Sequence, residues 1–247
     1  MRSNIRLALE RLTGFHIYKQ PPRGSDIFAD ISRDLPTLRV RTVFDVGANV
    51  GQSAREYLRA FPEARIFCFE PVQSTFQTLA REVYGVSRVS VHCIALGAKD
   101  ETTTMSLDGP SSMYRLASVA TDRGWKVGAT EEVSAKTLDT FCAENLITSI
   151  DFLKIDTEGA ELKVLAGTKA MLSRAAVGLI QIEVGIGVGE AWHVPFGDIQ
   201  RHMASLDYHV FSLTEQHPSF MPPQPYLARM DAVFISPSLA KQGLRGG

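Results

Sequence analysis

The order of apolar and polar positions from residue 40 onward predicts buried strands that alternate with amphipathic helices. Five segments are apolar at consecutive positions, as strands covered on both faces require: 40–46, 64–69, 89–94, 150–156 and 177–184. Four others fit helices between them: 52–60, 73–83, 138–144 and 195–206. Strands and helices that alternate over short connections are typical of parallel βαβ units.

Two further apolar segments, 208–213 and 232–235, read as paired strands separated by a proline-rich loop. The prolines of that loop are Pro218, Pro222, Pro223 and Pro225. We therefore predict an α/β, Rossmann-like fold: a seven-stranded, mostly parallel sheet with a C-terminal antiparallel hairpin and helices on both faces.

The alternation of apolar strands and amphipathic helices is interrupted at three places, and we use these places to predict the domain organisation. Residues 1–38 form an N-terminal helical extension, 39–238 the core domain and 239–247 a flexible tail. Between about 98 and 134 only 102–107 alternates like an exposed strand, and the remainder reads as loops. Because so long a connection inside a compact domain is often functional, we interpret it as an insertion that acts as a substrate lid, with Met113, Tyr114 and Trp125 shaping the acceptor pocket.

Composition and charge narrow the class of protein. The 247 residues are 45% hydrophobic, enough for one full core, and the formal net charge of -1 gives no general attraction to nucleic acid. The three cysteines form no C-x-x-C pair, which favours a reducing, cytoplasmic setting. No segment has the roughly 20 apolar residues of a membrane span. Oligomeric state is not indicated.

The N-terminal helix carries Ile5, Leu9 and Leu12 on one face, with arginines beside them. Two interpretations remain open. Either this helix packs over the domain, or it makes a peripheral contact with an anionic membrane surface.

Residues 43–51 contain the first candidate binding site. A buried strand ends in Asp45, and the chain then turns through Gly47, Asn49 and Gly51 into a helix. Glu70 ends the next strand about 20 residues later, where an acid can accept hydrogen bonds from the hydroxyls of a ribose. Both a nicotinamide dinucleotide and S-adenosylmethionine contain such a ribose.

The side chains of this loop favour S-adenosylmethionine. A dinucleotide fingerprint needs glycines at the positions of Asn49 and Gln52, so that the backbone approaches a pyrophosphate. Asp45 favours a cofactor with a positive sulfonium and opposes a diphosphate. The alternative is structural: Asp45 caps the turn and Asn49 caps the helix.

A third cluster follows the strand 150–156. Lys154 and Asp156 share one face of that strand, and Asp156 at its end is our candidate general base, with Lys154 orienting it. His193 is a second candidate base, although a histidine beside a tryptophan is more often structural. Asp156, Glu158 and Glu183 together could instead hold a hard divalent cation such as Mg²⁺.

Four motifs in order carry a family resemblance: VFDVGANVGQS, FCFEP, HCIALG and DFLKIDTEGAE. Over about 43–234 the chain resembles the FkbM family of S-adenosylmethionine-dependent methyltransferases. The resemblance implies the class I methyltransferase fold and O-methylation, often of sugars or natural-product hydroxyls. It also implies that the cofactor contacts Asp45, Gly47, Asn49 and Glu70, with the backbone near Ile94 and Ala95 flanking its adenine. We count Gly51, Pro71 and Asp156 among the candidate cofactor-binding residues as well.

We therefore predict an S-adenosylmethionine-dependent O-methyltransferase that acts on a hydroxyl of a sugar, glycolipid or natural product. One alternative is an NAD(P)-dependent oxidoreductase, which Asn49 and the absence of a Tyr-x-x-x-Lys pair weaken. Another is a non-catalytic cofactor-binding module that docks through its basic N-terminal helix. The sequence does not identify the acceptor.

Overall fold

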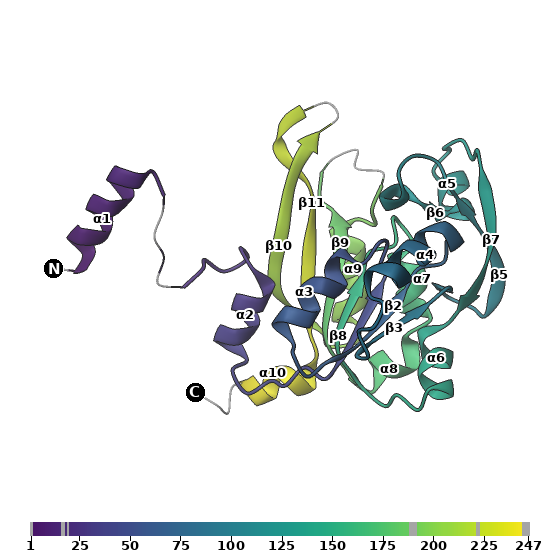
Figure 1. The fold of residues 1–247 in the computed structure, drawn as a ribbon, viewed down its shortest axis with the longest axis horizontal. Coiled ribbons are helices and arrows are strands. Elements are labelled where there is room, and N and C mark those ends of the chain that lie inside the picture. The colour runs from purple at the N-terminus through teal and green to yellow at the C-terminus, as the bar shows by residue number, and fades with distance from the viewer. Residues whose placement is uncertain (1, 16–17, 19, 188–191, 221–222, 244–247) are drawn as a thin grey trace.

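The main sheet lies at the centre of the domain and has helices on both faces (Figure 1). The computed structural model describes residues 2–15, 18, 20–187, 192–220 and 223–243. In this part of the chain the main sheet has seven strands in the order β10-β11-β9-β8-β1-β2-β3. Their bounds are β1 Thr42–Val46, β2 Arg65–Phe69, β3 Val89–His92, β8 Ile150–Ile155, β9 Val177–Gly185, β10 His209–Phe220 and β11 Pro223–Ile235.

The direction of the strands confirms the predicted fold class. Strands β3, β2, β1, β8 and β9 pair in parallel, whereas β11 pairs antiparallel with both β9 and β10. All the parallel strands therefore present their carboxyl ends at one edge of the sheet, where ligands bind in open α/β folds.

Alternation along each strand divides the core between the two faces of the sheet. Phe44 and Leu153 belong to a cluster covered by α6 (Leu138–Glu144), α7 (Glu161–Ala166), α8 (Lys169–Ser173) and α9 (Phe196–Ala204). Their neighbours Val43 and Phe152 face the opposite cluster, covered by α2 (Ile27–Asp34), α3 (Gln52–Ala60), α4 (Gln73–Glu82) and α10 (Pro237–Gly243). These strands are apolar at nearly every position because both faces are buried.

Helix α2 is fixed against strand β10 by a buried carboxylate. Asp30 has no exposed surface, and it accepts hydrogen bonds from Ser212 Oγ and from the backbone N–H of Gly24 at 2.9 Å. Burial alone would raise the pKa of Asp30, but these hydrogen bonds and Arg33 outweigh it and lower that pKa. The N-terminus of α2 is thereby held beside the carboxyl edge of the main sheet.

The predicted insertion folds as a second, smaller sheet. Its strands β4 (Ala95–Leu96), β7 (Thr130–Lys136), β5 (Glu101–Ser106) and β6 (Arg115–Leu116) lie in that order, at the end of the molecule away from the β10–β11 hairpin (Figure 1). The exposed strand expected near 102–107 is present as β5. Helix α5 (Ala117–Asp122) was not predicted. Strand β7 was not predicted either, because its only buried apolar residues, Val133 and Ala135, stand between polar ones.

Two predicted boundaries in the sheet are corrected. The strand expected over 89–94 ends at His92, and Ala95 pairs instead with Ala135 of β7. The proline-rich loop is largely part of the hairpin, since β10 continues to Phe220 and β11 begins at Pro223. Register shifts around Pro218 allow a proline in an edge strand. Pro222, which was assigned to the loop, lies outside the described residues.

The ends of the chain also differ from expectation. Helix α2 does not extend from the domain, because Ile27 and Ile31 are buried in its core. The flexible tail was expected from residue 239, but Leu239 is buried against the sheet and α10 continues to Gly243. Residues 244–247 lie outside the described part.

Helix α1 (Arg2–Thr13) stands apart from the sheets in Figure 1. Leu7 and Leu9 are nearly half exposed, and Leu12 is 84% exposed. The interpretation in which this helix buries its apolar face against the domain therefore finds no support in its described side chains. Among the helices described, none has the length and apolar character needed to cross a bilayer.

Candidate active site

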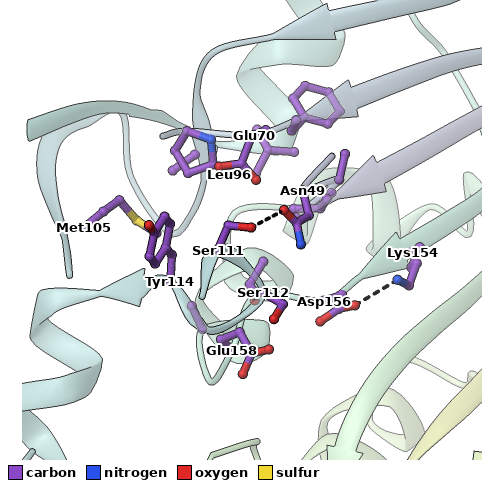
Figure 2. A pocket seen from close by; sticks show the side chains of 18 of the residues that line it. Asn49, Glu70, Leu96, Met105, Ser111, Ser112, Tyr114, Lys154, Asp156 and Glu158 are labelled. Carbon is purple, nitrogen blue, oxygen red and sulfur yellow. Dashed lines mark hydrogen bonds and ion pairs between the residues drawn. The ribbon is translucent and has the colours of Figure 1, made fainter. Parts of the chain in front are cut away.

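A cavity of about 280 Å³ lies at the carboxyl ends of β1, β2 and β8, under the second sheet (Figure 2). Nine of the residues singled out from the sequence line it: Gly47, Asn49, Glu70, Pro71, Ile94, Ala95, Lys154, Asp156 and Glu158. Four others do not: Asp45, Gly51, Glu183 and His193. The motifs, which are far apart in the sequence, thus converge on one cavity.

The glycine loop takes its shape from three left-handed residues. Gly47, Asn49 and Gly51 have φ angles of 85°, 47° and 91°. A Cβ at Gly47 would lie only 2.9 Å from the carbonyl carbon of Asp156 and closer still to its oxygen. Gly47 is therefore required because the loops after β1 and β8 approach each other backbone to backbone. Gly51 begins α3 instead, packed against Leu79 of α4.

Asn49 joins this loop to the second sheet. Its Oδ1 accepts a hydrogen bond of 2.9 Å from Ser111 Oγ (Figure 2). A non-glycine residue at positive φ is strained, and such strain is retained where the surroundings hold it in place. Ser111 was not singled out from the sequence, because the loop chemistry around it gave no sign of a partner 62 residues away.

Glu70 lies in the wall of the cavity at the end of β2. The side chain is 7% exposed, and its Oε1 accepts a 3.0 Å hydrogen bond from the backbone N–H of Val72. Burial raises the pKa of this carboxyl to about 7, and backbone hydrogen bonds from Val72 and Asn49 oppose the shift. A buried acid in this position suits a ligand whose hydroxyl groups donate hydrogen bonds to it.

The second sheet and the residues next to it supply apolar lining of the cavity. Met105 and Tyr114 line it together with Ile94, Leu96 and Leu116. This combination suits a flat aromatic ring. Tyr114 was assigned to the acceptor pocket, whereas the structure places it in this first cavity.

Trp125, which was also assigned to the acceptor pocket, does not line this cavity. The Arg115 guanidinium lies 4.5 Å from the Trp125 ring centroid and 4.1 Å from that of Trp192. These contacts join the insertion to the segment after β9 through cation–π attraction.

Asp45 lies behind the loop and does not line the cavity. It has no exposed surface, and neither carboxylate oxygen has a hydrogen-bond partner in the described part of the chain. Burial raises its pKa to about 6, and the charge of Lys154, which is opposite in the β1–β8 register, opposes the shift. Because Asp45 points to the α3 side of the sheet, the structure gives it an electrostatic partner in Lys154.

Lys154 and Asp156 form an ion pair at the end of β8. Lys154 Nζ lies 2.8 Å from Asp156 Oδ2 and 3.2 Å from Ser53 Oγ. Burial raises the pKa of Asp156, with Lys154 opposing it. Burial would lower the pKa of Lys154, but the charge of Asp156 outweighs it and raises that pKa well above its usual value. A charged lysine therefore orients a carboxyl group whose basicity is increased by burial.

His193 is paired with acids. Its Nε2 lies 3.0 Å from Glu183 Oε2 and 3.7 Å from Glu158 Oε2. Burial would lower the pKa of His193, but Glu183 outweighs it and raises that pKa to about 9. The imidazole is thus protonated at neutral pH, and it does not line the cavity. These properties fit a positioning residue better than a general base.

The side chains that could bind a cation together are not the three that were predicted. One ligand atom each from Glu158, Glu183 and His193 lie within 4.8 Å of one another, and Asp156 is not in this group. Glu183 is also bound by Arg229 Nη1 at 2.5 Å. Burial alone would raise the pKa of Glu183, but His193 outweighs it and lowers that pKa to about 2. Mg²⁺ prefers oxygen ligands, so a set containing protonated histidine and an arginine neighbour does not fit it.

The strand order and the cavity at the carboxyl ends of β1, β2 and β8 define a class I methyltransferase fold. The model of the methyltransferase FkbM domain matches residues 45–210, and the chain belongs to that family.

Two curated relatives have related sequences. Methyltransferase 1 of Beauveria bassiana is 32% identical over 51% of this chain and 57% of its own length. The 2-O-methyltransferase NoeI of Sinorhizobium fredii is 26% identical over 53% of this chain and 59% of its own. The matched region thus spans less than two thirds of either relative. Among solved structures, the METTL16 methyltransferase domain aligns over 95% of this chain and 78% of its own, with 10% identity and a TM-score of 0.49.

Proposed function

We propose that the protein is an S-adenosylmethionine-dependent O-methyltransferase that acts on a hydroxyl group of a sugar, glycolipid or natural product. The observation that carries the proposal is the position of the Lys154–Asp156 pair. The pair stands in the wall of the cavity that contains Asn49 and Glu70, and also in the wall of a second, polar cavity. A group shared by two cavities suits a reaction between a cofactor in one and an acceptor in the other.

The proposed cofactor fits the residues of the first cavity. Glu70 would accept hydrogen bonds from the ribose hydroxyls, and the apolar wall at Leu96 and Tyr114 would hold the adenine. Asp156 and Glu158 stand where a positive sulfonium and amino group would be attracted. When bound, S-adenosylmethionine supplies a methyl group on an activated leaving group.

In the proposed mechanism the protein holds the acceptor hydroxyl in line and removes its proton. Asp156 accepts that proton as the oxygen develops negative charge, and Lys154 keeps the carboxylate in place. Glu183 remains ion-paired with His193 and lies within hydrogen-bond reach of Asp156. The name of the relative NoeI, a 2-O-methyltransferase, supports oxygen as the methylated atom.

The rival functions make different demands on the same site. A dinucleotide would need its pyrophosphate against the loop where Asn49 is hydrogen-bonded to Ser111. A non-catalytic module would need no base, yet Asp156 is ordered by Lys154 between two cavities. Both observations favour the methyltransferase.

The experiment that tests the proposal is a methyl-donor turnover assay across glycans, glycolipids and polyketide-like alcohols, with and without chelator. We expect transfer to at least one hydroxylated acceptor, with a rate that chelator leaves unchanged because Lys154 and Arg229 already pair with Asp156 and Glu183, two of the proposed metal ligands. Cofactor binding without turnover on any acceptor would support the non-catalytic module instead.

Replacing Glu70 with alanine is expected to weaken S-adenosylhomocysteine binding by about 10- to 150-fold. This range corresponds to loss of one hydrogen bond to a charged group, about 1.5–3 kcal/mol. Isothermal titration calorimetry measures it. The matched control is Glu63→Ala, at an exposed position before β2, which should leave the affinity unchanged. Equal affinities of the two variants would remove Glu70 from the cofactor site.

Cofactor binding is expected to release protons at neutral pH. Burial raises the pKa of Glu70 to about 7 and that of Glu158 to about 8, so both carboxyls are partly protonated in the free protein. A positively charged ligand favours their ionised forms, and the affinity should therefore rise as the pH increases from 6 to 8. Titrations in two buffers of different ionisation enthalpy measure the release. Glu158→Gln should reduce it, and proton uptake would contradict the assignment.

A further inference from the structure

A second cavity of about 540 Å³ lies on the other side of Lys154 and Asp156, beneath the N-terminus of α2 and beside α3 and the β10–β11 hairpin. Six carboxylate residues line it: Asp26, Glu56, Asp156, Glu183, Glu215 and Asp231. The permanent cations in its wall are Lys154 and Arg229. The cavity therefore has a large excess of acidic groups.

Both of those cations are already paired within the wall. Lys154 is bound to Asp156 at 2.8 Å, and Arg229 to Glu183 at 2.5 Å. His217 lies 3.7 Å from Glu215. Asp26 Oδ1 caps α2 and Asp231 Oδ2 accepts from Gln181. Their other oxygens and the carboxylate of Glu56 can accept hydrogen bonds from a ligand, and these charges repel a ligand that carries phosphate, sulfate or carboxylate.

Tyr57 of α3 is an independent sign that this cavity receives a ligand. It lines the cavity, is only 2% exposed, and its hydroxyl has no hydrogen-bond partner among the described residues. A buried tyrosine hydroxyl normally has a partner. Its ring lies edge to face with Phe28, another lining residue, at 6.3 Å between centroids. The wall thus combines a hydroxyl that is open to a ligand, carboxylate oxygens and aromatic surface.

We infer that this second cavity is the acceptor site, and that it takes a polyhydroxylated ring that is neutral or positively charged, such as an unphosphorylated glycosyl unit. Donor hydroxyls or an ammonium group of the ring meet the carboxylates, Tyr57 bonds a ring oxygen or hydroxyl, and one hydroxyl reaches Asp156. The inference rests on the proposed function.

The charge of the cavity also disfavours a sugar that is attached to a nucleotide. A nucleotide-activated sugar carries a diphosphate, which the carboxylates oppose. The inferred ring is therefore one that carries no nucleotide diphosphate when it is methylated.

The test compares ligands that share one ring and differ in charge. Protein saturated with S-adenosylhomocysteine is titrated with a neutral methyl pyranoside, its 2-amino analogue, its 6-phosphate and its uronate, and binding is followed by saturation-transfer NMR. We expect the neutral and amino rings to bind at least tenfold more tightly than the two anionic rings. Equal or tighter binding of the anionic rings, or no binding of any ring, would overturn the inference.

Two variants locate the binding. Tyr57→Phe should weaken the neutral ring about three- to tenfold, as expected for one hydrogen bond, and leave S-adenosylhomocysteine affinity and thermal stability unchanged. The control is Tyr84→Phe, at a position that is 90% exposed. Glu56→Lys should improve binding of the 6-phosphate. If neither Tyr57→Phe nor Glu56→Lys changes ring binding, the second cavity is not the acceptor site.

The outcomes separate this inference from the proposed function. Normal S-adenosylhomocysteine binding together with a preference for anionic rings overturns only the acceptor class. Failure to bind S-adenosylhomocysteine removes the proposed function itself.

Discussion

Asp156→Asn is expected to lower kcat by about 10²- to 10⁴-fold while S-adenosylhomocysteine affinity changes by less than about threefold. Asparagine keeps the shape of the side chain and an oxygen for Lys154, which now lies 2.8 Å from Asp156 Oδ2. It cannot accept the proton of the acceptor hydroxyl. Single-turnover kinetics measure the chemical step, and calorimetry measures the affinity.

The control for this substitution is Asp122→Asn, at an exposed position at the end of α5. It should leave both quantities unchanged. If Asp156→Asn keeps the wild-type rate, the general base is another group. His193→Gln would then be the next variant, since a protonated His193 should affect the rate only through the position of Glu183.

Gly47→Ala is expected to abolish measurable cofactor binding and to lower the free energy of unfolding by at least about 2 kcal/mol. Two causes add: strain at a φ of 85°, and a Cβ that collides with the backbone carbonyl group of Asp156. The loops after β1 and β8 would have to separate, and both form walls of the cofactor cavity. Chemical denaturation and calorimetry check the two effects.

Gly85→Ala is the matched control because the two glycines share one backbone conformation. Gly85 has a φ of 78°, and a Cβ there would meet no atom within 4 Å. It should cost about 1 kcal/mol and leave cofactor binding intact. Equal effects of the two substitutions would show that the approach of the β1 and β8 loops does not determine the cavity.

The parallel core could be predicted from the sequence because its signals are local. Strand β1 and helix α3 follow from an apolar segment, a glycine turn and a helical repeat that are contiguous in the chain. The second sheet could not be predicted in the same way. Its pairs, such as Ala95 with Ala135, join positions 40 residues apart, and most side chains of β7 are polar or half exposed.

The positions of residues at strand ends beside the cavity could be predicted from the sequence, whereas positions that depend on side-chain direction could not. Glu70 and Asp156 follow their strands directly and Asn49 lies three residues after β1, so the common edge of a parallel sheet brings them together. Asp45 precedes its strand end by one residue, and its side chain faces α3. Tyr57 reads as an ordinary buried residue of a helix, and only the structure shows that it lines the second cavity.

Calorimetric titration of the protein with S-adenosylhomocysteine and, separately, with NAD tests most directly whether the cavity around Asn49 and Glu70 binds a phosphate-free, S-adenosyl cofactor. We expect one-to-one binding of S-adenosylhomocysteine, competition by S-adenosylmethionine, and no heat of binding for NAD. Tight binding of NAD without binding of S-adenosylhomocysteine would contradict the proposed function.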